Sequence, residues 1–242
     1  YTLTLATAYR MLFGWRPNVL RPGQNVLVWG ASGGLGVFAV QLCAVSGAHA
    51  IGVVSSEDKK DYVLSMGAKA ALNRKDFNCW GQLPTVNGPE FNDYMKESRK
   101  FGKAIWEHTG GKDVDIVFEH PGEATFPVSV LVCKRGGMVV ICAGTTGYNL
   151  TMDARFLWMR QKRVQGSHFA HLYHASQANQ LVIDRRIDPA MSEVLPWDKI
   201  PDAHEKMLDN KHAPGNMAVL VNAQRSGLRT YEDVLELSGT RG

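Results

Sequence analysis

The stretch VLVWGASGGLGVFAVQL, residues 26–42, decides how the rest of the chain is interpreted. An apolar run ends at Gly30, a glycine-rich turn follows, and the next residues repeat apolar side chains at the spacing of a helix. Glycine allows a tight turn, close approach of a phosphate to the backbone, and close packing of a helix on a strand. A strand, glycine turn and helix in this order predict a dinucleotide-binding βαβ unit, and the alternative is a tight turn without a ligand.

The glycine turn supplies the first candidate binding residues. Aligned on the helix start, it reads Ala31-x-Gly33-x-x-Gly36. The first turn of the following helix would offer unpaired N–H groups and the positive end of its dipole to the phosphates of the ligand. The residues predicted to bind the cofactor here are Gly30, Ala31, Ser32, Gly33, Gly34, Leu35 and Gly36.

The end of the next apolar run predicts which dinucleotide is bound. NAD-binding proteins usually place an acid there, and it accepts a hydrogen bond from the ribose 2′-hydroxyl. This chain has Ser55 and Ser56 instead, followed by Lys59. Hydroxyl groups and a lysine suit a 2′-phosphate, so we expect these three residues to bind NADPH. The same stretch also has the pattern of a helix N-cap with acids in the first turn, and both interpretations can hold together.

Apolar runs alternate with helical spacing along most of the chain, which is typical of a parallel sheet built from βαβ units. The expected fold class is α/β, a doubly wound parallel Rossmann sheet of about six strands. Helices are expected at 34–46 and 58–66. The expected strands lie at 25–30, 49–56, 113–120, 138–144 and 162–169, with a weaker one near Leu72.

Two segments interrupt this alternation and define the expected domains. Residues 73–112 form an insert that is first polar and then helical, and we expect it either to make a subunit contact or to run over the surface. From residue 187 the chain has the pattern strand, helix, strand, punctuated by prolines. A dinucleotide-binding domain is therefore predicted over 1–186, and a segment that leaves the sheet over 187–242. The expected apolar face of the insert helix consists of Phe91, Tyr94, Phe101, Ile105 and Trp106.

Composition and charge argue against several classes of protein. The 27 basic and 23 acidic residues leave a net charge of +4, which together with the lack of a long basic run argues against nucleic-acid binding. The apolar runs are far shorter than the roughly 20 residues of a membrane span, and no signal peptide is visible. Four cysteines without metal-type spacing indicate a reduced, cytoplasmic setting. The chain opens at Tyr1 inside an expected helix, and we therefore expect a fragment of a longer protein.

Several longer motifs resemble the medium-chain dehydrogenase/reductase superfamily, in its quinone-reductase-like branch. The run GASGGLGVFAVQLC and the spacing from Ser55 through Lys59 to Gly67 carry this broader likeness. More narrowly, the chain resembles the crotonyl-CoA carboxylase/reductase family from Tyr1 to about Val221. The narrower likeness rests on TLTLATAYRMLFGW, VFEHPGEATFPVSV, CKRGGMVVICAGTTGY and RFLWMRQKRVQGSHFA.

The resemblance implies an activity. NADPH would give hydride to the β-carbon of an α,β-unsaturated acyl-CoA, and the resulting enolate would attack CO2, which converts crotonyl-CoA to ethylmalonyl-CoA. The alternatives are an NADPH-dependent enoyl-CoA or quinone reductase that protonates the enolate, and a dinucleotide-binding fragment without turnover. The resemblance also implies that residues 187–242 return to a GroES-like catalytic domain whose remainder lies outside this sequence, so this chain alone is expected to be inactive.

His168 is the candidate catalytic residue. It follows the sixth expected strand, and ligands in open α/β sheets bind outside the carboxyl ends of strands. The family uses a histidine in this GSHFA context to bind CO2, so the resemblance assigns that role to His168; the alternative is a strand-end histidine satisfied by backbone groups. Thr7, by the same superfamily likeness, is expected to contact the nicotinamide, as are Ala143 and Gly144 by their position. His120 is expected either to border the nicotinamide or to belong only to the turn formed by the following Pro-Gly.

The remaining candidates concern metal, CoA and subunit contacts. His171 and His174 are expected to be solvated helix residues, because no Asp, Glu or Cys accompanies them at ligand spacing, and no metal site is predicted. Arg155 and Arg160 are candidates for the CoA phosphates, with a solvated basic helix end as the alternative. The sixth strand, over 162–167, is expected at a sheet edge, covered by a contact in a homodimer or homotetramer.

Overall fold

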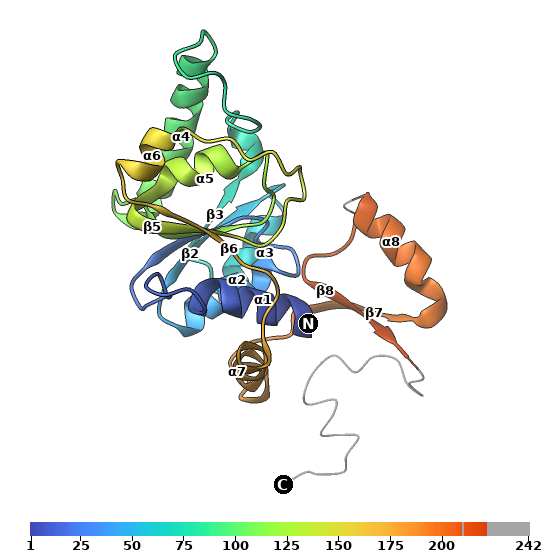
Figure 1. The fold of residues 1–242 in the computed structure, drawn as a ribbon. Helices are drawn as coiled ribbons and strands as arrows, with labels where there is room; N and C mark the ends of the chain where they lie inside the picture. Colours follow the sequence, from blue (N-terminus) through green and yellow to red (C-terminus); the bar gives the residue numbers. More distant parts are fainter. Residues whose placement is uncertain (210, 222–242) are drawn as a thin grey trace. The chain divides into compact units, whose positions relative to one another are not determined.

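A computed structural model, which describes residues 1–209 and 211–221, has six strands in one parallel sheet. The strands follow the order β3-β2-β1-β4-β5-β6 (Figure 1). This is the order of a doubly wound sheet, so the predicted fold class is confirmed. The strands are β1 (Asn25–Val28), β2 (His49–Val54), β3 (Ala70–Asn73), β4 (Val114–Glu119), β5 (Cys133–Ile141) and β6 (Arg163–Gly166).

The central strands are mostly apolar because they are covered on both faces. Val26, Leu27 and Val28 of β1 are all fully buried. Figure 1 shows α4, α5 and α6 on one side of the sheet and α1 and α2 on the other, with α7 beyond α1. The helices are α1 (Thr2–Phe13), α2 (Gly36–Val45), α3 (Lys59–Ser65), α4 (Phe91–Thr109), α5 (Phe126–Val132), α6 (Ala154–Trp158) and α7 (Leu172–Ile183).

The order of the sheet reverses beside β1. This strand pairs with β2 on one side and with β4 on the other, with Val28 next to both Gly52 and Phe118. Ligands of open α/β sheets bind outside the carboxyl ends of the strands at such a reversal. The loops that follow β1 and β4 therefore flank the expected ligand site.

The insert packs onto the sheet rather than running over the surface, and its predicted role in a subunit contact stays a prediction. Phe101 of α4 is fully buried and stacks on Trp29, which follows β1, with ring centroids 5.7 Å apart. Trp80 and Phe77 lie edge-on against Phe101, at 5.4 Å and 5.1 Å. Since aromatic side chains bury large apolar areas, this cluster makes the insert part of the core.

The predicted apolar face of the insert helix is correct at Phe91, Phe101 and Ile105 and wrong at Trp106. Trp106 is 42% exposed, and its indole N–H donates to Asp113 at 2.8 Å. An indole carries a polar group as well as an apolar ring, so it can lie at the border of a buried face.

The described chain divides into two compact units, 1–188 and a second that begins at Pro189. In the second unit β7 (Met191–Pro196) is followed by α8 (Ile200–Leu208) and then by β8 (Asn216–Leu220). The two strands pair in parallel, so the strand, helix, strand pattern predicted here is correct. The rest of the segment predicted over 187–242, beyond residue 221, lies outside the described residues.

Candidate active site

The glycine turn after β1 is shaped by two close internal contacts. Gly30 has a φ of +56°, in the left-handed region that favours glycine. A Cβ atom on Gly36 would lie 2.7 Å from the Cα of Ala31 and closer still to the carbonyl oxygen of Gly30. The helix therefore starts directly against the turn, and a side chain at residue 36 would push the two apart.

Gly33 differs from its neighbours because nothing inside the protein requires it to lack a side chain. A Cβ atom there would meet only the carbonyl oxygen of Gly30, at 3.4 Å. No side chain caps the following helix at Leu35, which leaves N–H groups of its first turn for an anion. The open side of Gly33 beside an uncapped helix start is the arrangement that a bound pyrophosphate requires.

His120, at the end of β4, closes over the first turn of this loop. Its Nε2 atom lies 3.1 Å from the carbonyl oxygen of Trp29, and a Cβ atom on Gly30 would come within 2.6 Å of the same nitrogen. Burial lowers the pKa of His120, so the ring is neutral and its Nε2–H can donate to Trp29. The imidazole is thus used within the protein, and its contact with the nicotinamide stays a prediction.

The carboxyl end of β2 gathers hydroxyl and ammonium groups. The Nζ atom of Lys59 lies 3.3 Å from the Oγ of Ser55, and the neighbouring Lys60 pairs with Glu57 instead, at 2.7 Å. A hydrogen bond from Ser56 lowers the pKa of Asp58 most, and Lys75, just beyond β3, is near enough to contribute a smaller lowering. Sequence reasoning missed Lys75; its position after the strand beside β2 was the available signal.

The loops after β4 and β5 are joined to each other. The N–H of Thr146 donates to the carbonyl of Pro121 at 2.8 Å, and Thr145 donates to that of His120 at 3.3 Å. A Cβ atom on Gly122 would lie 2.9 Å from the Cα of Gly144. These contacts fix the backbone of the two loops against each other. The predicted contact of Ala143 and Gly144 with the nicotinamide stays a prediction.

His168 lies two residues past β6, and its side chain is exposed. The backbone around it is held by one side chain of α1 and by one from the loop that follows α1. The guanidinium of Arg10 donates to the carbonyl of His168 at 3.0 Å, and the indole of Trp15 donates to the Oγ of Ser167 at 3.1 Å. Phe169 has a φ of +47°, which is uncommon for a bulky residue. Sequence reasoning missed Arg10 and Trp15, because contacts across about 150 positions leave no local pattern.

Thr7 is buried on α1, and its hydroxyl donates to the carbonyl of Leu3 at 2.8 Å. This hydrogen bond lies within the helix, so the hydroxyl would have to rotate in order to donate to a nicotinamide. The predicted contact of Thr7 with the cofactor therefore stays a prediction.

His171 and His174 stack on each other rather than lying apart in solvent. Their ring centroids are 3.9 Å apart, and burial lowers the pKa of His174, with smaller contributions from His171 and Arg10. His171 is the N-cap residue of α7 and His174 lies in its first turn. Among residues 1–209 and 211–221, no group of three or more His, Cys, Asp or Glu side chains is placed to hold a metal ion.

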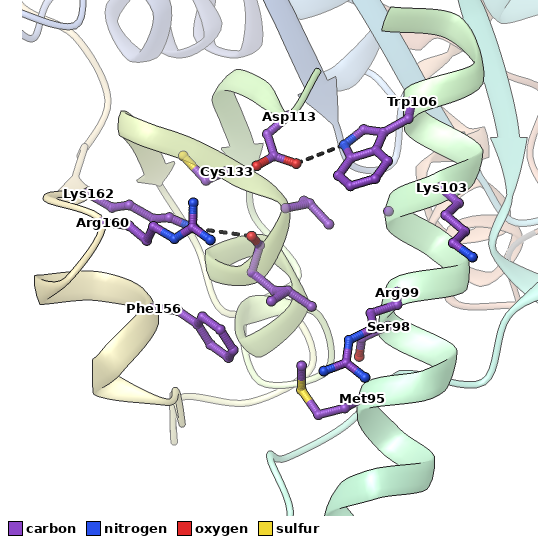
Figure 2. Close-up of a pocket in the computed structure, with 13 residues that line it drawn as sticks. Met95, Ser98, Arg99, Lys103, Trp106, Asp113, Cys133, Phe156, Arg160 and Lys162 are labelled. Atoms are coloured by element: carbon purple, nitrogen blue, oxygen red, sulfur yellow. Dashed lines mark hydrogen bonds between the residues drawn. The ribbon is translucent and has the colours of Figure 1, made fainter. Parts of the chain in front are cut away.

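The basic cluster predicted to bind CoA is partly used within the protein. Arg155 makes a paired interaction with Asp153, with its Nη2 atom 2.6 Å from Oδ2, although half of the arginine side chain is exposed. Lys162 donates to the carbonyls of Val130 and Leu131. Arg160 instead lines a pocket beside α4, together with Lys162, Phe156 and side chains of that helix (Figure 2). Arg155 and Arg160 thus lie in different surroundings, and the prediction that they bind the phosphates of CoA stays a prediction.

Comparison with known proteins identifies clear relatives. The family model described as zinc-binding dehydrogenase matches residues 34–184. A crotonyl-CoA carboxylase/reductase from Cereibacter sphaeroides is 70% identical over 98% of this chain and 55% of its own length. A solved structure of a crotonyl-CoA carboxylase/reductase matches with a TM-score of 0.92 and 75% identity, covering 98% of this chain and 56% of that one. The 2-octenoyl-CoA carboxylase reductase CinF, solved with NADP and 2-octenoyl-CoA, matches at 36% identity and a TM-score of 0.86 over 98% of this chain and 52% of its own.

These matches confirm the resemblance that the motifs indicated. They also set its extent, because the chain spans about half the length of the curated relatives it matches. In the described part of the chain, no helix is both long enough and apolar enough to cross a membrane.

Proposed function

Because this chain belongs to the zinc-binding dehydrogenase family, we propose that it is the dinucleotide-binding half of an NADPH-dependent enoyl-CoA carboxylase/reductase. The observation that carries the proposal is the 70% identity to the relative from Cereibacter sphaeroides over nearly the whole chain. The activity belongs to the longer protein, and this chain alone would bind the cofactor without turnover.

The residues present fit NADPH. The open side of Gly33 and the uncapped start of α2 would receive the pyrophosphate. Ser55, Ser56 and Lys59 would receive the 2′-phosphate, with the charge of Lys75 nearby. The NADP in the CinF structure, whose fold matches this chain closely, supports the same cofactor here.

When bound, NADPH supplies the hydride for the β-carbon of an α,β-unsaturated acyl-CoA. The electron pair of the substrate double bond then lies on the α-carbon, where it can form a bond to CO2 or to a proton. His168 lies beyond the carboxyl end of β6, at the same edge of the sheet as the glycine turn. Its imidazole would donate to an oxygen of the new carboxylate and stabilise the charge that develops there, which favours carboxylation over protonation.

Arg155, half-exposed beside Asp153, and Arg160 are the proposed contacts to the CoA phosphates. The zinc of the family's name is a separate matter. The described residues form no set of three ligating side chains, so they do not fit a zinc ion and no step is assigned to one.

The edge of the sheet supports a proposed assembly. Strand β6 is the last strand of the sheet, and the side chain of Val164 is partly exposed on it. Unpaired strand edges are usually covered in folded proteins, so we propose a homodimer or homotetramer in which β6 is paired or covered. The free thiols of Cys43, Cys79, Cys133 and Cys142 support a reducing, cytoplasmic setting.

The proposal is tested by product analysis with the longer protein that contains this chain. Crotonyl-CoA and NADPH are supplied with and without bicarbonate, and ethylmalonyl-CoA and butyryl-CoA are quantified. Ethylmalonyl-CoA that appears only with bicarbonate supports reductive carboxylation. Butyryl-CoA as the sole product under both conditions would replace it with simple reduction.

A further inference from the structure

Glu119, the last residue of β4, is a fully buried carboxyl group at the reversal of the sheet, with 0% exposure. Its Oε1 atom accepts from the N–H of Gly122 at 3.0 Å and from the hydroxyl of Thr125 at 2.7 Å. Its Oε2 atom accepts from the hydroxyl of Ser129 at 2.5 Å. These three groups, and the backbone N–H of His120, are uncharged donors, so the site holds a carboxylate by hydrogen bonds rather than by an ion pair.

The donors come from different parts of the fold. Ser129 lies on α5 and accepts from the indole N–H of Trp29 at 2.8 Å, so its own proton is committed to Glu119. Thr125 is the N-cap residue of α5, and Gly122 lies in the turn that follows β4. One carboxylate thus joins the turn after β4, the first turn of α5, and the tryptophan that precedes the glycine turn.

The turn held by Glu119 also contacts the glycine turn directly. His120, the residue after Glu119, lies against Gly30 and bonds to the carbonyl of Trp29. Trp29 is therefore held at both its indole and its carbonyl by groups that Glu119 positions. Any loosening of the turn would be transmitted to the residues that are proposed to receive the pyrophosphate.

We propose that Glu119 is a positioning residue for the dinucleotide, whose ionised carboxylate holds residues 120–125 and α5 against the glycine turn and whose protonation weakens dinucleotide binding. The inference rests on the proposed function, because it takes NADPH as the ligand of the glycine turn. It adds a proton-dependent control of cofactor binding by a residue that does not itself touch the cofactor.

The balance between the two protonation states lies near neutrality. Burial raises the pKa of Glu119 to about 7, although hydrogen bonds from Ser129, from Thr125 and from the backbone of Gly122 and His120 oppose the increase. The neighbouring titratable groups, His120 and Cys142, do not change charge near pH 7. His120 is neutral because burial lowers its pKa, and burial raises the pKa of Cys142, on the neighbouring β5 side, to about 11. The ionised form of Glu119 is thus present above about pH 7 and is lost as the pH falls through that value.

Protonation changes the hydrogen bonding of the site. A protonated carboxyl carries its own hydrogen and needs an acceptor, so the hydroxyl of Thr125 or Ser129 must change from donor to acceptor. At least one charge-assisted hydrogen bond to the turn or to α5 is therefore replaced by a weaker neutral one. Glutamine at this position has the same shape and needs the same reversal at every pH, because its NH2 group can only donate.

The test is fluorescence titration of NADPH into this chain and into its Glu119→Gln variant between about pH 6 and about pH 8. The measured quantity is the ratio of the variant's Kd to that of the wild type at each pH, in which the titration of the 2′-phosphate cancels. We expect a ratio of about five at the upper pH, since a charge-assisted hydrogen bond is replaced by a neutral one, and a ratio near one at the lower pH, where both proteins carry an uncharged group.

Two further variants separate positioning from a general effect on the fold. Thr125→Val removes one donor to the ionised form at nearly constant volume, which raises the pKa of Glu119. The pH at which NADPH affinity falls should therefore be higher in this variant than in the wild type. Glu123→Gln is the matched control: its carboxylate lies in the same turn but accepts from Gln82, and this variant should keep the wild-type pH dependence.

The outcomes distinguish the inference from the function on which it rests. Wild-type protein that binds no NADPH at any pH overturns both. Wild-type protein that binds NADPH, with a Glu119→Gln ratio that is constant or largest at low pH, overturns the inference alone. An unmoved midpoint in a folded Thr125→Val variant, checked by circular dichroism, also counts against it.

Discussion

The loops after β1 and β4 and the loop after β6 lie at the same edge of one sheet but are built differently. At the centre, His120 packs against Gly30, and Glu119 is buried among donors from the turn after β4 and from α5. At the margin, His168 has an exposed side chain and a backbone held by Arg10 and Trp15 from the start of the chain. The difference indicates that the proposed cofactor site is built from contacts close together in the fold, whereas the side chain of His168, proposed to bind CO2, is exposed and only its backbone is held.

The largest expected effect comes from a substitution in the glycine turn after β1. Gly36→Ala places a Cβ atom against the carbonyl of Gly30 and 2.7 Å from the Cα of Ala31, so α2 must move. We expect a loss of about 3 kcal/mol in the free energy of unfolding, together with loss of NADPH binding. Gly33→Ala is the control, because its Cβ has space: it should weaken NADPH binding while the denaturation midpoint stays near wild type. Equal destabilisation by both substitutions would contradict this description of the turn.

The next effect tests the margin. His168→Asn keeps a polar side chain but moves the donor, so in the longer protein carboxylation should fall more than reduction. The loss should be at most about 2.7 kcal/mol, the lower end for one donor to a developing oxyanion. The measurement is the yield of ethylmalonyl-CoA relative to butyryl-CoA. His171→Ala should keep the wild-type ratio, and an unchanged ratio in His168→Asn with hydride transfer intact would leave His168 a structural residue.

A smaller effect concerns cofactor choice. Lys59→Ala removes an ammonium group that lies beside Ser55, so it should weaken NADPH by about 1.5 kcal/mol and NADH much less. Isothermal titration with both cofactors measures the difference. Lys60→Ala is a matched control, since that lysine pairs with Glu57 and should not discriminate between the two. A loss in Lys59→Ala that is equal for NADPH and NADH would argue against a 2′-phosphate site at this position.

The smallest expected effect concerns the contact between Trp15 and Ser167, next to His168. Trp15→Phe keeps the ring but removes the N–H that donates to Ser167, which should loosen the backbone before His168. We expect a shift of about 1 kcal/mol toward butyryl-CoA in the product ratio of the longer protein. Trp106→Phe loses a similar indole hydrogen bond, to Asp113, on a different part of the fold and should leave the ratio unchanged. If both variants shift the ratio equally, the contact to Ser167 has no specific role.

The same contrast explains how much could be predicted from the sequence. The six strands and the glycine turn were predictable because each is a local pattern of apolar spacing, glycine and helix start. The packing of the insert on Trp29 was not, because Phe101 meets that ring across more than seventy residues and leaves no periodic signal. Trp106 was misassigned because spacing alone does not reveal that its N–H reaches Asp113.

The candidate site follows the same rule. Gly33 and Lys59 were predicted from their positions in short motifs, and in the structure both are partly exposed, with open space beside Gly33. Glu119 was missed, because an acid at a strand end does not show in the sequence whether it is solvated or surrounded by donors. Arg10 was missed for a different reason: its partner is a backbone carbonyl, which has no signature in the sequence at all.

The end of β2 has a consequence for how cofactor preference can evolve. Lys59 bonds to Ser55 within the same turn, and neither Ser55 nor Ser56 is part of the buried core. Substitutions there should be nearly neutral for the fold, so we expect that a few changes at this proposed 2′-phosphate site, in a lineage or in a laboratory library, exchange one dinucleotide for the other. Gly30, by contrast, is constrained both by its positive φ and by the adjacent ring of His120, so we expect it to tolerate almost no substitution.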